Sequence, residues 1–252
     1  MRYILFFILI IFSLSVSADQ LKAHWAFDEL SGSIQDTAGS YSANVYNSPG
    51  KGNEGKFGKA YYFNNSAYAI TNSTPFRSSG AFTYSVWTKL SSSDSGGYAM
   101  GAGVNGGQGS GGIGIYGSKA GFYWTPTTTF GSCDTSFGTE TSFDIKDNEW
   151  HHIVYSLDYN NLNTWKIYVD GIAMETSVKT WKSGTPYENA VTDAHPVTHY
   201  NTGNDYLGGR WVNSLYTYQG YLDDIAIWNK QLNGTDVESL YFLGTAVFEN
   251  SE

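Results

Sequence analysis

The chain has 252 residues, with 14 Lys and Arg against 23 Asp and Glu, and a formal net charge of −9. Aromatic residues make up 17% of it and charged residues only 15%, which argues against a disordered chain and against a coiled coil. The acidic balance leaves no basic surface for nucleic acid, and a single cysteine excludes an intramolecular disulfide or a cysteine-based zinc site.

The first eighteen residues have the layout of a secretory signal peptide. Arg2 precedes the apolar run 4–12, and Val16-Ser17-Ala18 resembles a small-residue cleavage site. The alternative is a membrane anchor, but the run is shorter than the about 20 residues that span a bilayer. We therefore expect a secreted or extracellular protein (periplasmic in a bacterium) with no membrane span after removal of residues 1–18. In that setting Cys133 is either a buried, inert thiol or a bridge between chains.

Short segments with period-2 patterning follow, separated by turn residues. The clearest strand, 82–88, places Thr83, Ser85 and Trp87 on one face and mostly apolar residues on the other. Asp170-Gly171 after the run 165–169 predicts a tight type I′ hairpin. The expected strands are 23–27, 60–63, 82–88, 112–116, 152–157, 165–169 and 221–228.

One segment near the C-terminus has the pattern of a helix. Thr235 and Glu238 have capping-box spacing, and Val237, Leu240 and Tyr241 fall on one helical face. We therefore predict an all-β protein, a two-sheet antiparallel sandwich with one short C-terminal helix. It forms a single domain over residues 19–246, with a tail at 247–252.

The usual catalytic patterns are absent from the sequence. The glycine run 96–121 contains two literal GxGxxG matches, but no helix follows either, so we interpret the run as connections leading into a strand. Asp223 and Asp224 are adjacent, so regular strand alternation would point them to opposite faces rather than into one cleft. The histidines lack zinc-site spacing, and no nucleophile elbow is present.

Acidic residues gather near both ends of the domain. Asp28, Glu29 and Asp36 lie early, while Asp223 and Asp224 lie late. Ca²⁺ takes about six to eight oxygen ligands, so these acids could share one ion if the terminal strands pair. Solvated turn acids are the other interpretation, and the residues alone do not choose.

The region 181–220 carries aromatic residues in segments without clean strand alternation. Loop aromatics can stack on the C–H faces of sugar rings, and amide, carboxylate or guanidinium neighbours can bind the hydroxyls. Any one aromatic is better interpreted as core packing, but together they form a candidate binding rim. Its residues are Trp181, Asn204, Asp205, Arg210, Trp211, Tyr216 and Tyr218.

Several short segments stand in a recognisable order along the chain. They are Trp25 to Glu29 with Gly32 and Asp36, segment 58–63, segment 82–87, segment 148–153 followed by 168–171, and 207–209 followed by 220–228 and 238–241. Together they resemble the laminin G-like domains of the concanavalin A-like jelly-roll superfamily, whose "GKAxxF" strand is similar to segment 58–63. The most specific is Asn148-Glu149-Trp150-His151-His152-Ile153 followed by Tyr168-Val169-Asp170-Gly171.

This resemblance implies a two-sheet antiparallel jelly roll. It also implies a structural Ca²⁺ between the first and last strands, which maps onto Asp28, Asp36 and Asp223. The Glu-x-Asp-x-x-Glu strand of laminarinase-like relatives is absent from the sequence. We therefore expect a secreted, lectin-like, non-catalytic module that binds a carbohydrate. The alternatives are an extracellular adhesion or protein-recognition domain, and a divergent polysaccharide hydrolase or lyase.

Overall fold

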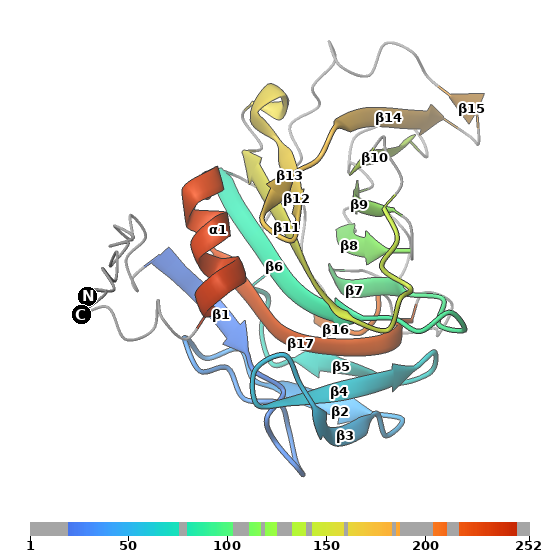
Figure 1. Cartoon of the computed structure of the whole chain (residues 1–252), viewed down its shortest axis with the longest axis vertical. Coiled ribbons are helices and arrows are strands. Elements are labelled where there is room, and N and C mark those ends of the chain that lie inside the picture. Colours follow the sequence, from blue (N-terminus) through green and yellow to red (C-terminus); the bar gives the residue numbers. More distant parts are fainter. Residues whose placement is uncertain are drawn as a thin grey trace, which may run out of the picture.

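The computed structural model shows two antiparallel sheets packed face to face, with one α-helix against the first sheet (Figure 1). This confirms the predicted all-β sandwich. Within the described ranges, no helix is long and apolar enough to cross a bilayer. The structure describes residues 20–75, 80–102, 111–116, 119–124, 133–139, 143–158, 161–182, 185–186, 204–210 and 217–245.

The first sheet has the strand order β13-β12-β11-β6-β17-β4-β3, and β1 pairs with β17 outside this path. The first and last strands therefore lie side by side, with Trp25 opposite Ile225. The members are β1 Leu21–Trp25, β3 Gly50–Glu54, β4 Lys59–Asn64, β6 Ala81–Lys89, β11 Trp150–Asp158, β12 Lys166–Val169, β13 Ile172–Ala173 and β17 Gln219–Trp228.

The second sheet has the order β15-β14-β10-β9-β8-β7-β16-β5-β2. Much of it lies in segments for which the sequence predicted no strand, although the expected strand 112–116 is present as β8. The members are β2 Ala43–Tyr46, β5 Tyr68–Thr71, β7 Gly97–Ala102, β8 Gly111–Ile115, β9 Ala120–Trp124, β10 Cys133–Thr139, β14 Thr176–Lys182, β15 Thr185–Pro186 and β16 Asp205–Leu207.

The main core fills the space between the two sheets. Tyr84 of β6 stacks on Phe122 of β9 with ring centroids 6.1 Å apart, so aromatic rings join the two layers. Trp165 meets Phe122 edge-on at 5.8 Å. All three residues are almost fully buried, as expected for side chains that alternate inward along half-buried strands.

The helix α1, Gly234–Leu243, covers the outer face of the first sheet (Figure 1). Val237 and Leu240 pack there, so both faces of β6 are buried and Trp87 is as inaccessible as Tyr84. The predicted helix is confirmed, but its predicted cap is wrong. Asn233 is the N-cap and Asp236 completes the capping box, because the helix begins before Thr235.

Candidate functional site

Two acidic residues from opposite ends of the domain hold the same turn. Asp28 follows β1, and its Oδ1 accepts a hydrogen bond from the Lys59 backbone N–H at 2.6 Å. Asp223 lies in β17, and its Oδ2 accepts from the N–H groups of Lys56 and Phe57 at 2.7 and 3.0 Å. The turn before β4 is therefore held by one carboxylate on each side, as the pairing of β1 with β17 allows.

Asp223 carries an unsatisfied oxygen. Its Oδ1 is buried and has no hydrogen-bond partner within the described structure. Burial raises the pKa of Asp223 to about 8, and the nearby Asp224 carboxylate adds to the rise, although N–H donors from Phe57 and Lys56 oppose it. A buried carboxylate oxygen without a partner is costly, and a cation is one way to satisfy it.

Asp36 is used differently from the other two predicted metal ligands. Its Oδ1 accepts from the N–H groups of His24, Ala38 and Gly39, and its Oδ2 accepts from Tyr41. These four bonds organise the loop after β1. Among the residues that the structure describes, no three acidic, histidine or cysteine side chains gather as a metal cluster. The predicted trio is therefore not brought together, and only Asp28 and Asp223 share a turn.

A β-bulge between Asp223 and Ala226 places both adjacent acids on the outer face of the first sheet. Asp223 lies opposite Trp87, which α1 covers, while the Asp224 carboxylate accepts from Thr245 and lies 2.5 Å from His24 Nε2. The expectation that they face opposite ways was wrong, because regular alternation fails at a bulge.

The backbone next to both turn-holding acids is strained. It has φ +49° at Asp224, which follows Asp223, and φ +58° at Phe27, which precedes Asp28.

The predicted binding rim is divided in the structure. Asn204 is exposed, but Asp205 and Tyr218 are completely buried. The Tyr218 hydroxyl bonds with Thr88 Oγ1 inside the sandwich, so its ring is part of the core and does not reach a ligand at the surface. Trp211, Tyr216 and the side chain of Trp181 lie outside the described residues.

Arg210 is buried on the outer face of the second sheet, where glycines leave room for it. A Cβ on Gly101 would lie 2.8 Å from the Arg210 Cβ, and a Cβ on Gly112 would lie 2.6 Å from the Tyr98 ring. Arg210 Nη1 donates to the Tyr98 hydroxyl at 2.8 Å, and its guanidinium lies 5.0 Å from the centre of that ring. These glycines are therefore strand positions that admit a buried cation–aromatic pair, not a phosphate loop.

A row of tyrosines continues this outer face toward the edge strand β2. Tyr46 pairs with Tyr68 in register, and their rings stack at 5.2 Å with 13° between planes. Tyr206 lies 6.2 Å from Tyr68 and is opposite Gly101. The inward row beside it, which includes Leu207 and Met100, belongs to the core, so the tyrosines face outward. We call Tyr46, Tyr68 and Tyr206 the tyrosine face. Tyr46 is 42% exposed, whereas Tyr206 is buried.

Sequence patterning did not find the tyrosine face. Its three residues come from short strands that are far apart in sequence, and neither β2 nor β16 has enough residues for a clear period. Only the strand pairing brings them together.

One buried pair has the chemical types of a nucleophile and its base. Ser85 Oγ lies 2.7 Å from His152 Nε2, but both residues are only 1% exposed. His152 Nδ1 has no partner in the described structure, and burial lowers the pKa of His152 to about 4. The ring stacks on Trp87 at 4.8 Å beneath α1. The pair is therefore inaccessible to a substrate and lacks an orienting acid.

A comparison with protein-family profiles identifies the family of the chain. The family profile described as "Concanavalin A-like lectin/glucanases superfamily" matches residues 63–238, which is more than half of the chain. The chain belongs to this superfamily. No curated protein sequence matches it. The resemblance predicted from the short motifs is thus confirmed for the superfamily and for the sandwich fold.

Solved structures share this fold at low sequence identity. Domain 4 of AbnA, a GH43 extracellular arabinanase from Geobacillus stearothermophilus in complex with arabinotriose, has a TM-score of 0.55 at 17% identity, covering 88% of this chain and 98% of that chain. The binding domain of Paraclostridial Mosquitocidal Protein 1 has a TM-score of 0.60 at 16% identity, covering 89% and 52%. The binding domain of botulinum neurotoxin DC in complex with rat synaptotagmin II has 0.56 at 14%, covering 89% and 52%. This chain therefore spans about half of each toxin domain.

Proposed function

We propose that this protein is a secreted, non-catalytic module that binds a carbohydrate through the tyrosine face. The observation that carries the proposal is the exposed Tyr46 ring stacked on Tyr68, on the strand that ends the second sheet. A flat, pre-positioned aromatic ring is a suitable partner for the C–H face of a sugar. The signal-peptide pattern at residues 1–18 supports secretion.

A polar amide group lies beside the tyrosine face. Asn44 lies on the same outward row as Tyr46 and is exposed, and Ile70 separates Asn44 from Tyr206 across the sheet. An amide beside an aromatic platform can bind sugar hydroxyls that a ring cannot. The AbnA domain with the same fold was solved with arabinotriose, which supports a carbohydrate as the ligand class.

The test is binding of the mature chain to a panel of polysaccharides and a glycan array. We expect binding that Tyr46→Ala weakens by about tenfold, since one aromatic contact contributes roughly 1.4 kcal/mol. The matched control is Tyr116→Ala, which removes a 40% exposed tyrosine from the end of β8. No glycan binding, or equal losses in both variants, would refute the proposal. Release of reducing sugars or unsaturated products from the same panel would instead favour the hydrolase or lyase alternative.

We also propose a narrower calcium site than the sequence resemblance implied. Asp28 and Asp223 would hold the ion, together with oxygen atoms of the turn between them, and Asp36 would not take part. The buried, unpartnered Oδ1 of Asp223 supports this assignment. The ion would supply charge compensation for a buried carboxylate and would tie the first strand to the last.

Protein recognition is the second candidate, and an exposed apolar cluster favours it. Ile172 is 70% exposed, Phe242 60% and Leu243 44%. Gly171, next to Ile172, lies against the Tyr241 ring, so the hairpin of β12 and β13 adjoins the end of α1. Apolar side chains this exposed commonly mark a contact surface. If Phe242→Ser abolishes capture of an extracellular protein while glycans never bind, this candidate replaces the first.

A further inference from the structure

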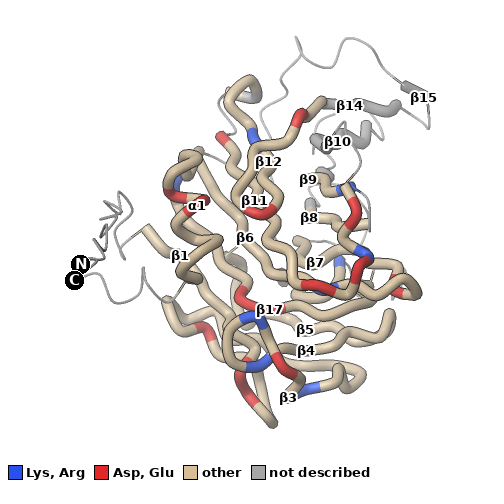
Figure 2. Tube along the Cα trace, viewed as in Figure 1, with Lys and Arg blue, Asp and Glu red and all other residues tan. Residues whose placement is uncertain are grey.

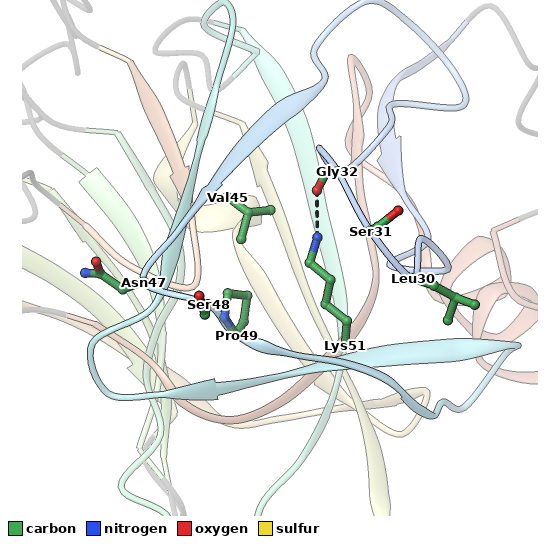
Figure 3. A pocket seen from close by; sticks show the side chains of 8 residues that line it. All are labelled: Leu30, Ser31, Gly32, Val45, Asn47, Ser48, Pro49 and Lys51. Atoms are coloured by element: carbon green, nitrogen blue, oxygen red, sulfur yellow. Dashed lines mark hydrogen bonds between the residues drawn. The ribbon is translucent and has the colours of Figure 1, made fainter.

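A notch opens at the edge of the sandwich where the chain crosses from one sheet to the other. β2 ends the second sheet and β3 ends the first in the described strand order, and residues 47–49 connect them. The loop after β1 forms the opposite wall (Figure 3). The notch has a volume of about 520 Å³, within the range of small-ligand pockets. Its lining residues are Leu30, Ser31, Gly32, Val45, Asn47, Ser48, Pro49 and Lys51.

The polar groups of the notch differ from those of the chain as a whole. The lining contains one cation, two serine hydroxyls and an amide, and no carboxylate, although the chain has 23 acidic residues. Figure 2 shows both acidic and basic residues around β3. The single charged residue of the notch lining is nevertheless a lysine. An ammonium group beside hydroxyl groups suits an anionic ligand.

Lys51 reaches from β3 across the notch toward the opposite loop (Figure 3). Its ammonium donates to the Gly32 carbonyl at 2.6 Å and lies 5.0 Å from the centre of the Tyr61 ring. No carboxylate within the described residues pairs with it at 4.0 Å or less. Because an ammonium has three N–H donors, two remain for a ligand after the bond to Gly32.

One wall of the notch has a constrained backbone. Asn47 and Ser48 have consecutive positive φ angles of 55° and 51°, and Asn47 Nδ2 donates to the Ser66 carbonyl at 3.0 Å, which pins this strained turn. On the other side Leu30 lies over Gly52, where a Cβ would come within 3.0 Å of its Cδ2. Non-glycine residues held in this backbone region are enriched at ligand sites.

We propose that the notch binds the carboxylate of a uronic acid unit in a polysaccharide, with Lys51 as the charge partner. This proposal rests on the carbohydrate-binding function and names the ligand class. Tyr46 and Asn47 are neighbours on β2 and its turn, so a chain on the tyrosine face can continue round the sheet edge into the notch. Ser31 and Ser48 also line the notch and carry hydroxyl groups.

The test compares acidic probes with matched neutral ones. Tetrasaccharides of galacturonic, glucuronic and mannuronic acid are titrated by calorimetry against their methyl esters, which keep the backbone but remove the charge. We expect the wild type to prefer at least one acid over its ester by about tenfold or more. Lys51→Gln should remove that preference, and Lys51→Arg should keep most of it. Lys59→Gln, an exposed lysine outside the notch, is the matched control for net charge.

The possible outcomes distinguish failure of the uronate site from failure of the carbohydrate-binding function. If no acid is preferred over its ester, or if Lys51→Gln and Lys59→Gln weaken binding equally, the uronate site is wrong although glycan binding stands. If Lys51→Gln weakens acids and esters alike, Lys51 acts only through its bond to Gly32 and the proposal also fails. If no glycan binds the wild type at all, the carbohydrate-binding function itself fails.

Discussion

Tyr218 is the residue whose role the structure changes most, and a double-mutant cycle with Thr88 tests the new role. The Thr88 hydroxyl donates to the Tyr221 carbonyl at 3.1 Å, so its oxygen accepts from the Tyr218 hydroxyl. Tyr218→Phe removes that donor and leaves Thr88 its other bond. The cost should be about 1 kcal/mol, the usual net value of one hydrogen bond.

Thr88→Val is the more damaging substitution, although it is nearly isosteric. It leaves a buried Tyr218 hydroxyl without an acceptor and the Tyr221 carbonyl without this donor, for a cost of about 2–3 kcal/mol. The double variant should lose less unfolding free energy than the sum of the two single losses, because Phe at position 218 has no hydroxyl that would be left without an acceptor. In a domain of this size, 1 kcal/mol corresponds to about 2–4 °C in Tm.

Urea unfolding of the four proteins measures the cycle, and glycan titration provides the second readout. We expect Tyr218→Phe to bind carbohydrate as the wild type does, because its ring is completely buried. If Tyr218→Phe keeps full stability but binds glycan tenfold more weakly, Tyr218 contacts the ligand as the sequence had predicted. A larger cost for Tyr218→Phe than for Thr88→Val would show that the hydrogen bond runs in the other direction.

Three further predictions follow from the contacts described above. Asp223→Asn should remove any rise of Tm in CaCl₂ over EGTA, whereas Asp36→Asn should lower stability by about 1–3 kcal/mol in both, because it faces four backbone donors. Gly112→Ala should cost about 1–3 kcal/mol in urea unfolding, since its Cβ would lie 2.6 Å from a ring carbon. The hydrogen bond to Asp170 raises the pKa of His151, so its stabilising contribution is complete below about pH 6.5 and is lost as pH rises through the folded pKa. His151→Gln should therefore be less stable than wild type at pH 5 and approach it by pH 9; a constant difference would contradict this.

The first sheet could be predicted because its strands carry their pattern locally. Segment 82–88 alternates clearly, and Asp170-Gly171 adopts the positive φ angles that a type I′ hairpin requires. The second sheet was mostly missed apart from β8, since β7 is rich in glycine and alanine and β2, β5 and β16 are too short to show a period. Their strand state depends on pairing with neighbours distant in sequence, which local propensity does not contain.

The site was predicted less well, for related reasons. Arg210 and Tyr218 were selected together because they lie close in sequence, but the structure places one on the outer face of the second sheet and the other in the core. Asp28, Asp36 and Asp223 were selected because the family resemblance implies an ion between the first and last strands. The pairing of β1 with β17 is present, and it brings Asp28 and Asp223 to one turn but leaves Asp36 in another loop.

The two sheets differ in what their outer faces can do. On the first sheet α1 buries Trp87 and His152, so a substitution there acts on stability. On the second sheet, Gly101 and Gly112 have no side chains, which leaves space for Arg210 and Tyr98 against the sheet. Tyr46 remains exposed at the edge. The space over these glycines is filled by Arg210 and the Tyr98 ring, which packing alone explains. The exposed Tyr46 ring, on the sheet that α1 leaves uncovered, is therefore the physical reason to propose recognition on that side of the sandwich.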